Sequence, residues 1–574
     1  MGTEIRGNAE IALKEIMLYV TRQPGRINSL WLLVLGGAAS VAVLVLLLRS
    51  DFGILQPTTS PGGGGSAQRL ALYCAAGLRF PVEQLARQYE QEYRVAVQIQ
   101  FGGSDTLLHQ IEVNKFDTGD LYLAADDWYT DEARQRGLAA ETIPVASQGL
   151  VIVVRKDSAK RIAGLRDLLA GDVRVALANP DQAAIGRATK RAAQQVPLDG
   201  GTLWQQLEQH VTKHGVFKPT VNEVASDVKL GSVDAGIVWD ATVQMPAFRD
   251  ELQAIEVSEL QAELDLVSVC VLNSSRQPTA ALKFARYLSA RDRGLPVFEQ
   301  HGLKPVDGDR WTERPEVTFF CGSVNRRAVE EIIAEFQQRE DATVNTIYDG
   351  CGILTSRMQT IDGQRPEQGF PDVYMACDRY YLENVKQWFQ DAVDVSDTEI
   401  VIAVPKGSTK VRALADLIRP GVRVAVGEPS QCTIGALTRR LLVHEGLYDR
   451  LKAKQNQAGE VVVEKSSSAL IVPDVVTGHV DAALAYRTDV QANLDTVDVV
   501  RFESSLNLAI QPFSIAKTSD HKYLGRRLLR KILDSPEAFE KAGFHFRPSA
   551  EFARQTSPPE KRPAARANAG TAIP

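Results

Sequence analysis

The chain has 574 residues, more than one hydrophobic core usually holds, so at least two domains are expected. Its 44% hydrophobic and 24% charged residues are typical of a globular protein. The net charge is −6, and outside a short tail the chain has no long basic run. Nucleic acid is therefore excluded as a partner, because its affinity depends on clustered Lys and Arg.

The first feature along the chain is an uncharged apolar run from Leu30 to Leu48, bounded by Arg26 and Arg49. Such a run can cross a bilayer core of roughly 30 Å, and basic residues before it favour a cytoplasmic N-terminus. We therefore predict a single-pass protein of the bacterial inner (plasma) membrane, with its soluble domains on the periplasmic side. A cleaved signal peptide is the alternative, but no small-residue cleavage site follows the run. The predicted segments are a cytoplasmic segment 1–26, a transmembrane helix 27–49 and a flexible linker 50–67.

Strand and helix patterns alternate from residue 68 onward. Residues 70–76, 94–101 and 119–125 have strand character, and the stretches between them space their apolar residues as helices do. This β-α-β-α-β order predicts a parallel sheet with covering helices. From Gly149 the pattern changes, and "GLVIVVRKD" predicts a strand that leaves the first sheet. Further strands and helices follow, up to a closing helix pair within 281–306, so two α/β lobes are expected.

The whole pattern then occurs a second time. "FGGSDTL" at 101–107 returns as "YDGCGIL", "GDLYLAADDWY" as "PDVYMACDRYY", "GDVRVALANPDQAAIGRATKR" as "PGVRVAVGEPSQCTIGALTRR", and "SVDAGIVW" as "HVDAALAY". The separations are 247, 252, 249 and 247 residues. Solenoid repeats recur every 20–50 residues or so, so this spacing indicates a duplicated domain instead. We predict domain 1 at 68–308, domain 2 at 314–550 and a disordered tail at 551–574.

Three turns of each copy place backbone N–H groups at helix starts. In domain 1 they are Ala76–Leu78, Gly103–Asp105 and Gln182–Ile185. Unpaired N–H donors and the positive end of the helix dipole form an anion site without formal charge. Ser104 adds a hydroxyl, although a serine at a helix start more often acts only as an N-cap.

The motifs "GGS-x-x-L", "D-L-Y-x-x-A-D", "R-V-A-L-x-x-P" and "V-D-A-G-I-V-W" together resemble the periplasmic molybdate-binding protein family. The resemblance covers roughly 68–306 and 316–550. It implies an α/β chain of two tandem type II periplasmic-binding-protein-like domains, each with two lobes. It also implies a small oxyanion ligand, molybdate or tungstate, and delivery to an ABC permease in the membrane. No enzymatic activity and no cofactor are implied.

The same resemblance assigns the ligand to two serines, backbone N–H groups and a tyrosine hydroxyl. Gly77 stands where the first serine is expected and Trp239 where the tyrosine is expected, and Gly350-Cys351-Gly352 replaces the Gly-Gly-Ser turn. The predicted ligand-binding residues of domain 1 are Ala76, Gly77, Gly103, Ser104, Ala183, Ala184 and Trp239. Those of domain 2 are Gly322, Ser323, Gly350, Cys351, Cys432, Thr433 and Tyr486.

The six cysteines form no CxxC pair, and no metal site is predicted. We interpret Cys351 and Cys432 as small buried residues, with a Cys351–Cys432 disulfide as the next alternative. A soft-metal site or a reactive thiol at the cleft remains an alternative.

His210 and His214 share a helix face and could bind a metal ion. We favour an exposed polar face without metal, since Val211 stands where a zinc protease needs Glu. Arg79, Arg187 and Arg439 flank the site turns; they could guard the cleft mouth, but as single arginines they are expected to be solvated.

Two functions follow from these patterns. The first is a membrane-anchored substrate-binding protein of an ABC importer, with an oxyanion bound in an interlobe cleft. The second is a sensory or structural ectodomain that keeps the fold without transport, which the incomplete donor sets at Gly77 and Cys351 would favour. Oxyanion-dependent stabilisation distinguishes the two, because ligand binding raises the free energy of unfolding.

Overall fold

The computed structural model describes residues 69–114, 119–198, 200–260, 264–361 and 369–547. The predicted segments 1–26, 27–49, 50–67 and 551–574 lie outside the described residues. Within the described ranges, no helix combines the length and the apolar character that a membrane crossing requires. The described part of the chain holds two α/β copies. The first copy is built on a six-stranded and a five-stranded sheet, and the second copy on one continuous ten-stranded sheet.

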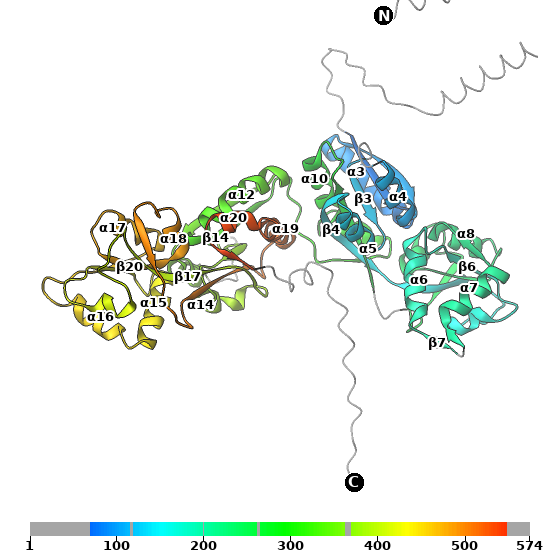
Figure 1. Cartoon of the computed structure of the whole chain (residues 1–574). Coiled ribbons are helices and arrows are strands. Elements are labelled where there is room, and N and C mark those ends of the chain that lie inside the picture. The colour runs from blue at the N-terminus through cyan, green and yellow to red at the C-terminus, as the bar shows by residue number, and fades with distance from the viewer. Residues whose placement is uncertain (1–68, 115–118, 199, 261–263, 362–368, 548–574) are drawn as a thin grey trace, which may run out of the picture. The chain divides into compact units, whose positions relative to one another are not determined.

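The first lobe of domain 1 is a mixed sheet in the order β13-β4-β12-β3-β1-β2. As predicted, β1 pairs in parallel with β2 and with β3. The sequence pattern gave no sign of β12, which inserts antiparallel between β3 and β4. Figure 1 shows α3 and α4 beside β3. The elements of this lobe are β1 (Arg69–Ala75), the 3₁₀ helix η1 (Ala76–Leu78), α3 (Arg79–Tyr93), β2 (Ala96–Gly102), α4 (Ser104–Val113), β3 (Leu121–Ala124), α5 (Asp127–Gln135), β4 (Ala139–Gln148), β12 (Asp265–Leu272), α10 (Pro278–Leu288), α11 (Gly294–Gln300) and β13 (Lys304–Pro305).

The second lobe is a five-stranded sheet in the order β11-β5-β10-β6-β9. The strand predicted to leave the first sheet after Gly149 is β5, and it pairs antiparallel with β10. All five residues of β10 are buried, as expected of a central strand that reads as a continuous apolar run. The elements are β5 (Leu150–Arg155), η2 (Leu165–Leu169), β6 (Val175–Ala178), α6 (Ala184–Gln194), β7 (Pro197–Leu198), β8 (Gly201–Thr202), α7 (Leu203–His214), β9 (Val216–Lys218), α8 (Val221–Lys229), β10 (Ala235–Trp239), α9 (Asp240–Gln244) and β11 (Leu252–Ile255).

Domain 2 repeats this order, with one difference in how its sheets join. A single strand, β17 (Val393–Pro405), pairs with β22 through its first half and with β20 through its second half. In domain 1 the same path is divided at Gly149 into β4 and β5. The two lobes of domain 2 therefore share one continuous strand. The first-lobe elements of domain 2 are β14 (Glu316–Gly322), η3 (Ser323–Asn325), α12 (Arg326–Glu340), β15 (Thr343–Asp349), α13 (Cys351–Ile361), β16 (Val373–Met375), α14 (Arg379–Glu383), η5 (Lys386–Trp388), β22 (Leu508–Ile515), α19 (Lys522–Leu533), α20 (Pro536–Lys541) and β23 (His545–Phe546).

The second half of domain 2 follows β17 and carries η6, β18, α15, α16 and the strands that flank them. Both copies end their first long helix on a residue other than glycine in the left-handed region, Arg94 at φ 59° and Asp341 at φ 48°. This shared helix end is a further sign of the duplication. The elements are η6 (Leu414–Ile418), β18 (Val424–Gly427), α15 (Thr433–His444), α16 (Tyr448–Gln455), β19 (Val462–Lys465), η7 (Ser468–Leu470), α17 (Val472–Val476), β20 (Ala482–Tyr486), α18 (Arg487–Gln491) and β21 (Val497–Val500).

Candidate functional site

The predicted site turns of domain 1 follow the carboxyl ends of strands β1, β2, β6 and β10. A Cβ atom placed on Gly103 would lie 2.1 Å from the carbonyl oxygen of Gln182, so these two turns are in direct contact. A Cβ atom on Gly77 would lie 3.0 Å from Val221 Cγ1 and 3.8 Å from Trp239 Cδ1. The structure thus brings Gly103 to the turn before α6, and Gly77 to the end of β10.

Ser104 is the first residue of α4, and Gly103 is the N-cap. Its hydroxyl oxygen accepts a hydrogen bond from the backbone N–H of Ala125 at 3.3 Å, and its carbonyl accepts one from the Tyr122 hydroxyl at 2.7 Å. The Ser104 side chain therefore holds the end of β3 rather than capping α4. Trp239 fills the position where the resemblance places a tyrosine, and it is 2% exposed.

Asn222 contacts a predicted site turn, and the sequence did not indicate it. Its side-chain amide donates to the carbonyl oxygen of Ala76 at 2.8 Å, which ties α8 to η1. Its Oδ1 atom is buried and has no hydrogen-bond partner among the described residues. No motif marked it, because it lies in a stretch for which no element was predicted.

Ion pairs join the two lobes of domain 1, and the expectation that Arg187 is solvated is wrong. Arg187 on α6 places its Nη1 2.9 Å from Asp126 Oδ2 and its guanidinium 3.9 Å from the centre of the Trp128 ring. Arg191, one turn later, pairs with Asp126 at 3.6 Å and with Asp265. Both aspartates are almost fully buried and belong to the first lobe, whereas α6 belongs to the second. We call Arg187, Arg191, Asp126 and Asp265 the interlobe ion-pair cluster.

In domain 2 the corresponding turns also meet. A Cβ atom on Gly350 would lie 2.7 Å from the carbonyl oxygen of Gln431 and 3.5 Å from Cys432 Cβ. The Ser323 hydroxyl lies 3.2 Å from that of Ser467. Across the two lobes, η3 thus contacts the residue before η7, and the N-terminus of α13 contacts the turn before α15.

Several hydroxyl groups of this region are buried and have no hydrogen-bond partner among the described residues. Thr433 is the first residue of α15, which begins without a side-chain cap, and Tyr486 ends β20. Burial raises the pKa of Tyr486 well above its usual range, so its hydroxyl keeps its proton and remains a donor. A buried donor without an acceptor costs about 1–3 kcal/mol, which a bound acceptor would recover. The unpartnered hydroxyls are those of Thr433, Tyr486, Tyr374 and Ser468.

Cys351 takes the place of Ser104. Its Sγ accepts from the N–H of Cys377 at 3.1 Å, as the Ser104 hydroxyl accepts from Ala125. Its nearest thiol is that of Cys377 at 2.9 Å, and not that of Cys432, which donates to backbone carbonyl oxygens. All six cysteines are buried and free, as the interpretation of small buried residues expects. Among the residues that the structure describes, no three His, Cys, Asp or Glu side chains are placed to hold a metal ion.

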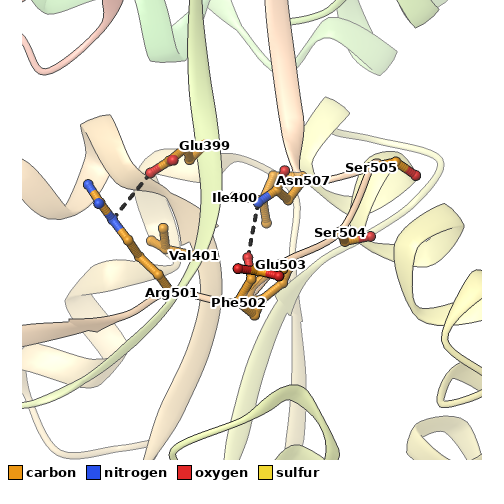
Figure 2. A pocket seen from close by; sticks show the side chains of 9 residues that line it. All are labelled: Glu399, Ile400, Val401, Arg501, Phe502, Glu503, Ser504, Ser505 and Asn507. Carbon is orange, nitrogen blue, oxygen red and sulfur yellow. Dashed lines mark hydrogen bonds and ion pairs between the residues drawn. The ribbon is translucent and has the colours of Figure 1, made fainter.

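A hollow of about 760 Å³ lies at a different place in domain 2 (Figure 2). It is bounded by the middle of β17 and by the segment before β22, where Arg501 pairs with Glu399 at 3.4 Å. The Asn507 side chain donates to the Phe502 carbonyl oxygen at 3.1 Å. None of the predicted site residues lines this hollow, which lies where β17 crosses between the lobes. The lining residues are Glu399, Ile400, Val401, Arg501, Phe502, Glu503, Ser504, Ser505 and Asn507.

Three curated proteins similar to this chain each match about one copy or less. A protein of Haemophilus influenzae named as a binding protein is 26% identical over 240 residues, which is 42% of this chain and 92% of the relative. Bacillus subtilis YvgL, named as an ABC transporter substrate-binding lipoprotein, is 25% identical over 41% of this chain and 85% of its own length. The molybdate-binding protein ModA of Mycobacterium tuberculosis is 28% identical over 24% of this chain and 52% of its own length.

Two solved structures are also similar. The periplasmic molybdate-binding protein of Azotobacter vinelandii is 21% identical, with a TM-score of 0.34, over 41% of this chain and 98% of its own. The sulfate-binding protein SubI of Mycobacterium tuberculosis is 18% identical, with a TM-score of 0.37, over 42% of this chain and 88% of its own.

The predicted localisation needs correction. The helix proposed at 27–49 lies outside the described residues, and no helix within them is long and apolar enough to cross a membrane. The relative YvgL is named as a lipoprotein, a different kind of attachment from a transmembrane helix. The prediction of a single-pass inner-membrane protein is therefore wrong, and we do not retain it.

The family described as bacterial extracellular solute-binding protein matches residues 70–304 and, a second time, residues 317–545. The two matches cover most of the chain and fall on the two copies that the sequence repeat and the sheet topology both separate. The chain therefore belongs to the bacterial extracellular solute-binding protein family, as a tandem duplication of the family's α/β periplasmic-binding-protein-like fold.

Proposed function

We propose that the chain is a substrate-binding protein of an ABC importer, and that domain 2 binds a small oxyanion of the molybdate and tungstate class. The observation that carries the proposal is the pair of buried, unpartnered hydroxyls of Thr433 and Tyr486 at the meeting point of the site turns. The names of YvgL and ModA support the transporter and the oxyanion, respectively. The function is binding, without catalysis.

The donor set named here consists of neutral backbone N–H and hydroxyl groups, which suits a dianion that carries its own charge. The N-termini of α13 and α15 converge near Gly350 and Gln431, and both helices point the positive end of their dipole at that place. Thr433 and Tyr486 add hydroxyl donors, and Ser323 adds a third. Each charge-assisted hydrogen bond contributes about 1.5–3 kcal/mol, so a few of them give tight binding.

Domain 1 offers a weaker version of the same site. Ala184 begins α6 where Thr433 begins α15, so domain 1 lacks that hydroxyl, and Trp239 presents an indole where domain 2 presents a phenol. We propose that domain 2 is the principal site. In domain 1, Ala76, Gly77, Gly103 and Ala184 supply backbone N–H groups for a weaker ligand interaction, whereas the Ala183 N–H already donates to the Asn179 carbonyl oxygen at 3.0 Å.

A structural role for domain 1 is the second candidate function. The interlobe ion-pair cluster joins α6 to the first lobe, and it needs no solute to do so. Domain 2 has Ala436 where domain 1 has Arg187, so the Arg187–Asp126 pair is particular to domain 1. A domain held closed by its own side chains would support the tandem protein without taking part in transport.

Titration calorimetry of the full chain with molybdate, tungstate, sulfate and phosphate tests the main proposal. We expect binding of at least one tetrahedral oxyanion. Thr433→Val removes one donor and should weaken that affinity about 10- to 100-fold, as expected for one charge-assisted hydrogen bond. The same variant should raise the free energy of unfolding without ligand, because it also removes an unsatisfied buried group.

Thr438→Val is the matched control. Thr438 is buried on the same helix, and its hydroxyl donates to the Gly435 carbonyl oxygen at 3.1 Å. Its loss should lower the free energy of unfolding by about 1 kcal/mol and leave oxyanion affinity unchanged. Absence of binding for all four anions would overturn the oxyanion proposal, and equal effects of the two variants would remove Thr433 from the site.

A further inference from the structure

Two cysteines of domain 2 place their sulfur atoms side by side behind the N-terminus of α13. The Sγ atoms of Cys351 and Cys377 are 2.9 Å apart, and both side chains are buried. A Cβ atom on Gly322 would lie 2.2 Å from Cys377 Sγ and 2.7 Å from Cys351 Sγ, so the glycine leaves the space that the pair occupies.

The fold does not require this pair. At the equivalent places domain 1 has Ser104 and Ala125, and there the same backbone hydrogen bond forms without sulfur. The two thiols are therefore specific to domain 2, and they face each other rather than Cys432. The Cys432 thiol donates to the carbonyl oxygens of Lys465 and Glu428, at 3.4 Å and 3.6 Å.

The surroundings distinguish the two thiols. Burial raises the pKa of Cys351, but the thiol and the backbone N–H of Cys377 outweigh that effect, so its pKa lies below the usual value. The pKa of Cys377 is raised well above its usual value by Cys351 and by burial. Cys351 also begins α13, where the positive end of the helix dipole favours a thiolate.

We propose that Cys351 and Cys377 are a dithiol that a disulfide-bearing oxidant, either a protein or a small molecule, converts into an intradomain disulfide. Bond formation needs the two sulfur atoms to approach from 2.9 Å to about 2.05 Å. Disulfides persist outside the cytoplasm, and the family to which the chain belongs is described as extracellular. The bond would fix the first residue of α13 to the segment that follows β16.

The exchange balances in two steps. The Cys351 thiolate attacks one sulfur of the oxidant's disulfide and displaces the other sulfur as a thiolate, which leaves a mixed disulfide on Cys351. Cys377 loses its proton and attacks Cys351 Sγ, which releases the oxidant's second thiolate. The two cysteines lose two protons and two electrons, and the oxidant's disulfide becomes two thiols.

The test uses the full chain incubated with oxidised glutathione, then unfolded and alkylated without reductant. We expect a product lighter by two hydrogen atoms than the reduced protein before alkylation, four alkylated cysteines, and a linked peptide pair that contains Cys351 and Cys377. Cys351→Ser and Cys377→Ala should each abolish that pair. Both variants introduce the domain 1 residue, so the fold accepts them, and circular dichroism checks this.

Cys432→Ala and Cys321→Ala are the controls, and both should keep the linked pair. Six alkylated cysteines in the oxidant-treated wild type would overturn the proposal. A linked pair between Cys351 and Cys432, or between Cys351 and Cys321, would overturn it equally. The experiment needs no solute, so its outcome is independent of the oxyanion proposal.

Discussion

Asp489, three residues beyond Tyr486, is half-buried and has a buried carboxyl oxygen, Oδ2, and it should make the stability of domain 2 depend on pH. Its Oδ2 atom has no hydrogen-bond partner among the described residues. Burial raises its pKa to about 6, and the positive charge of Arg327 offsets only part of that rise. The folded protein therefore binds this proton more tightly than the unfolded chain does, since an ordinary aspartate has a pKa near 3.9.

Because the pKa is higher in the folded state, the contribution of Asp489 to stability is complete below about pH 4 and is lost as the pH rises through about 6. Asp489→Asn should raise the free energy of unfolding by up to about 3 kcal/mol at about pH 8, and change it little at about pH 4. Urea unfolding at the two pH values measures the difference. The exposed Asp495→Asn should show no such pH dependence, and an equal shift of Asp489→Asn at both pH values would contradict the argument.

The sequence located most of the turn positions at the residue scale, but it did not predict their partners. Glycines and small residues after apolar runs marked Gly77, Gly103 and Gly350. The identity of the thiol beside Cys351 depends on how β14, β15 and β16 align, which no local spacing encodes. The pairing of Arg187 was missed for the same reason, because its partner Asp126 precedes α5 and lies 61 residues away in the chain.

At the scale of elements, the helix α6 connects the two lobes of domain 1 through the interlobe ion-pair cluster. Arg187→Ala removes the guanidinium closest to Asp126 and leaves that carboxylate 98% buried with only the more distant Arg191. Loss of one partner of a buried ion pair costs about 3–5 kcal/mol, and Arg191 should reduce this to the lower part of that range or below.

Hydrogen exchange measured by mass spectrometry should then show faster exchange in α6, in η1 and in the first turn of α4, because the lobes separate more often. Arg87→Ala on α3 is the control, since Arg87 is exposed and its contact with Glu83 is long at 4.0 Å. Unchanged exchange at α6 in Arg187→Ala would show that the cluster does not hold the lobes together.

Among the elements, the sequence predicted the parallel β1-β2-β3 core and the departure of β5, because both follow from apolar runs separated by helix-forming stretches. It did not predict β12, an apolar run that returns from the second lobe and pairs antiparallel with β3 and β4. Nor did it predict that β17 continues through both lobes whereas Gly149 divides β4 from β5. Strand order and continuity depend on long-range pairing, which apolar periodicity does not encode.

At the scale of the whole molecule, Glu340 connects the two copies. It is the last residue of α12 and is 1% exposed. Arg527 on α19 of domain 2 donates to it at 2.6 and 3.1 Å, and Arg286 on α10 of domain 1 lies 3.6 Å away. Burial raises the pKa of Glu340, but Arg527 and Arg286 lower it more, so the carboxylate stays charged.

Glu340→Gln should therefore destabilise both copies, because it leaves two buried guanidinium groups without their shared carboxylate. Breaking a buried pair by removing one partner costs about 3–5 kcal/mol. Scanning calorimetry should show a lower midpoint and a clearer separation into two transitions, since the charge that joins the copies is gone.

Glu330→Gln is the matched control on the same helix. Glu330 is 59% exposed and pairs with Arg326 at the surface, so its loss should change the free energy of unfolding by less than about 1 kcal/mol. If Glu340→Gln unfolds as the control does, the two copies must be joined by other contacts, of which the Arg339–Glu141 pair at 2.7 Å is the next to test.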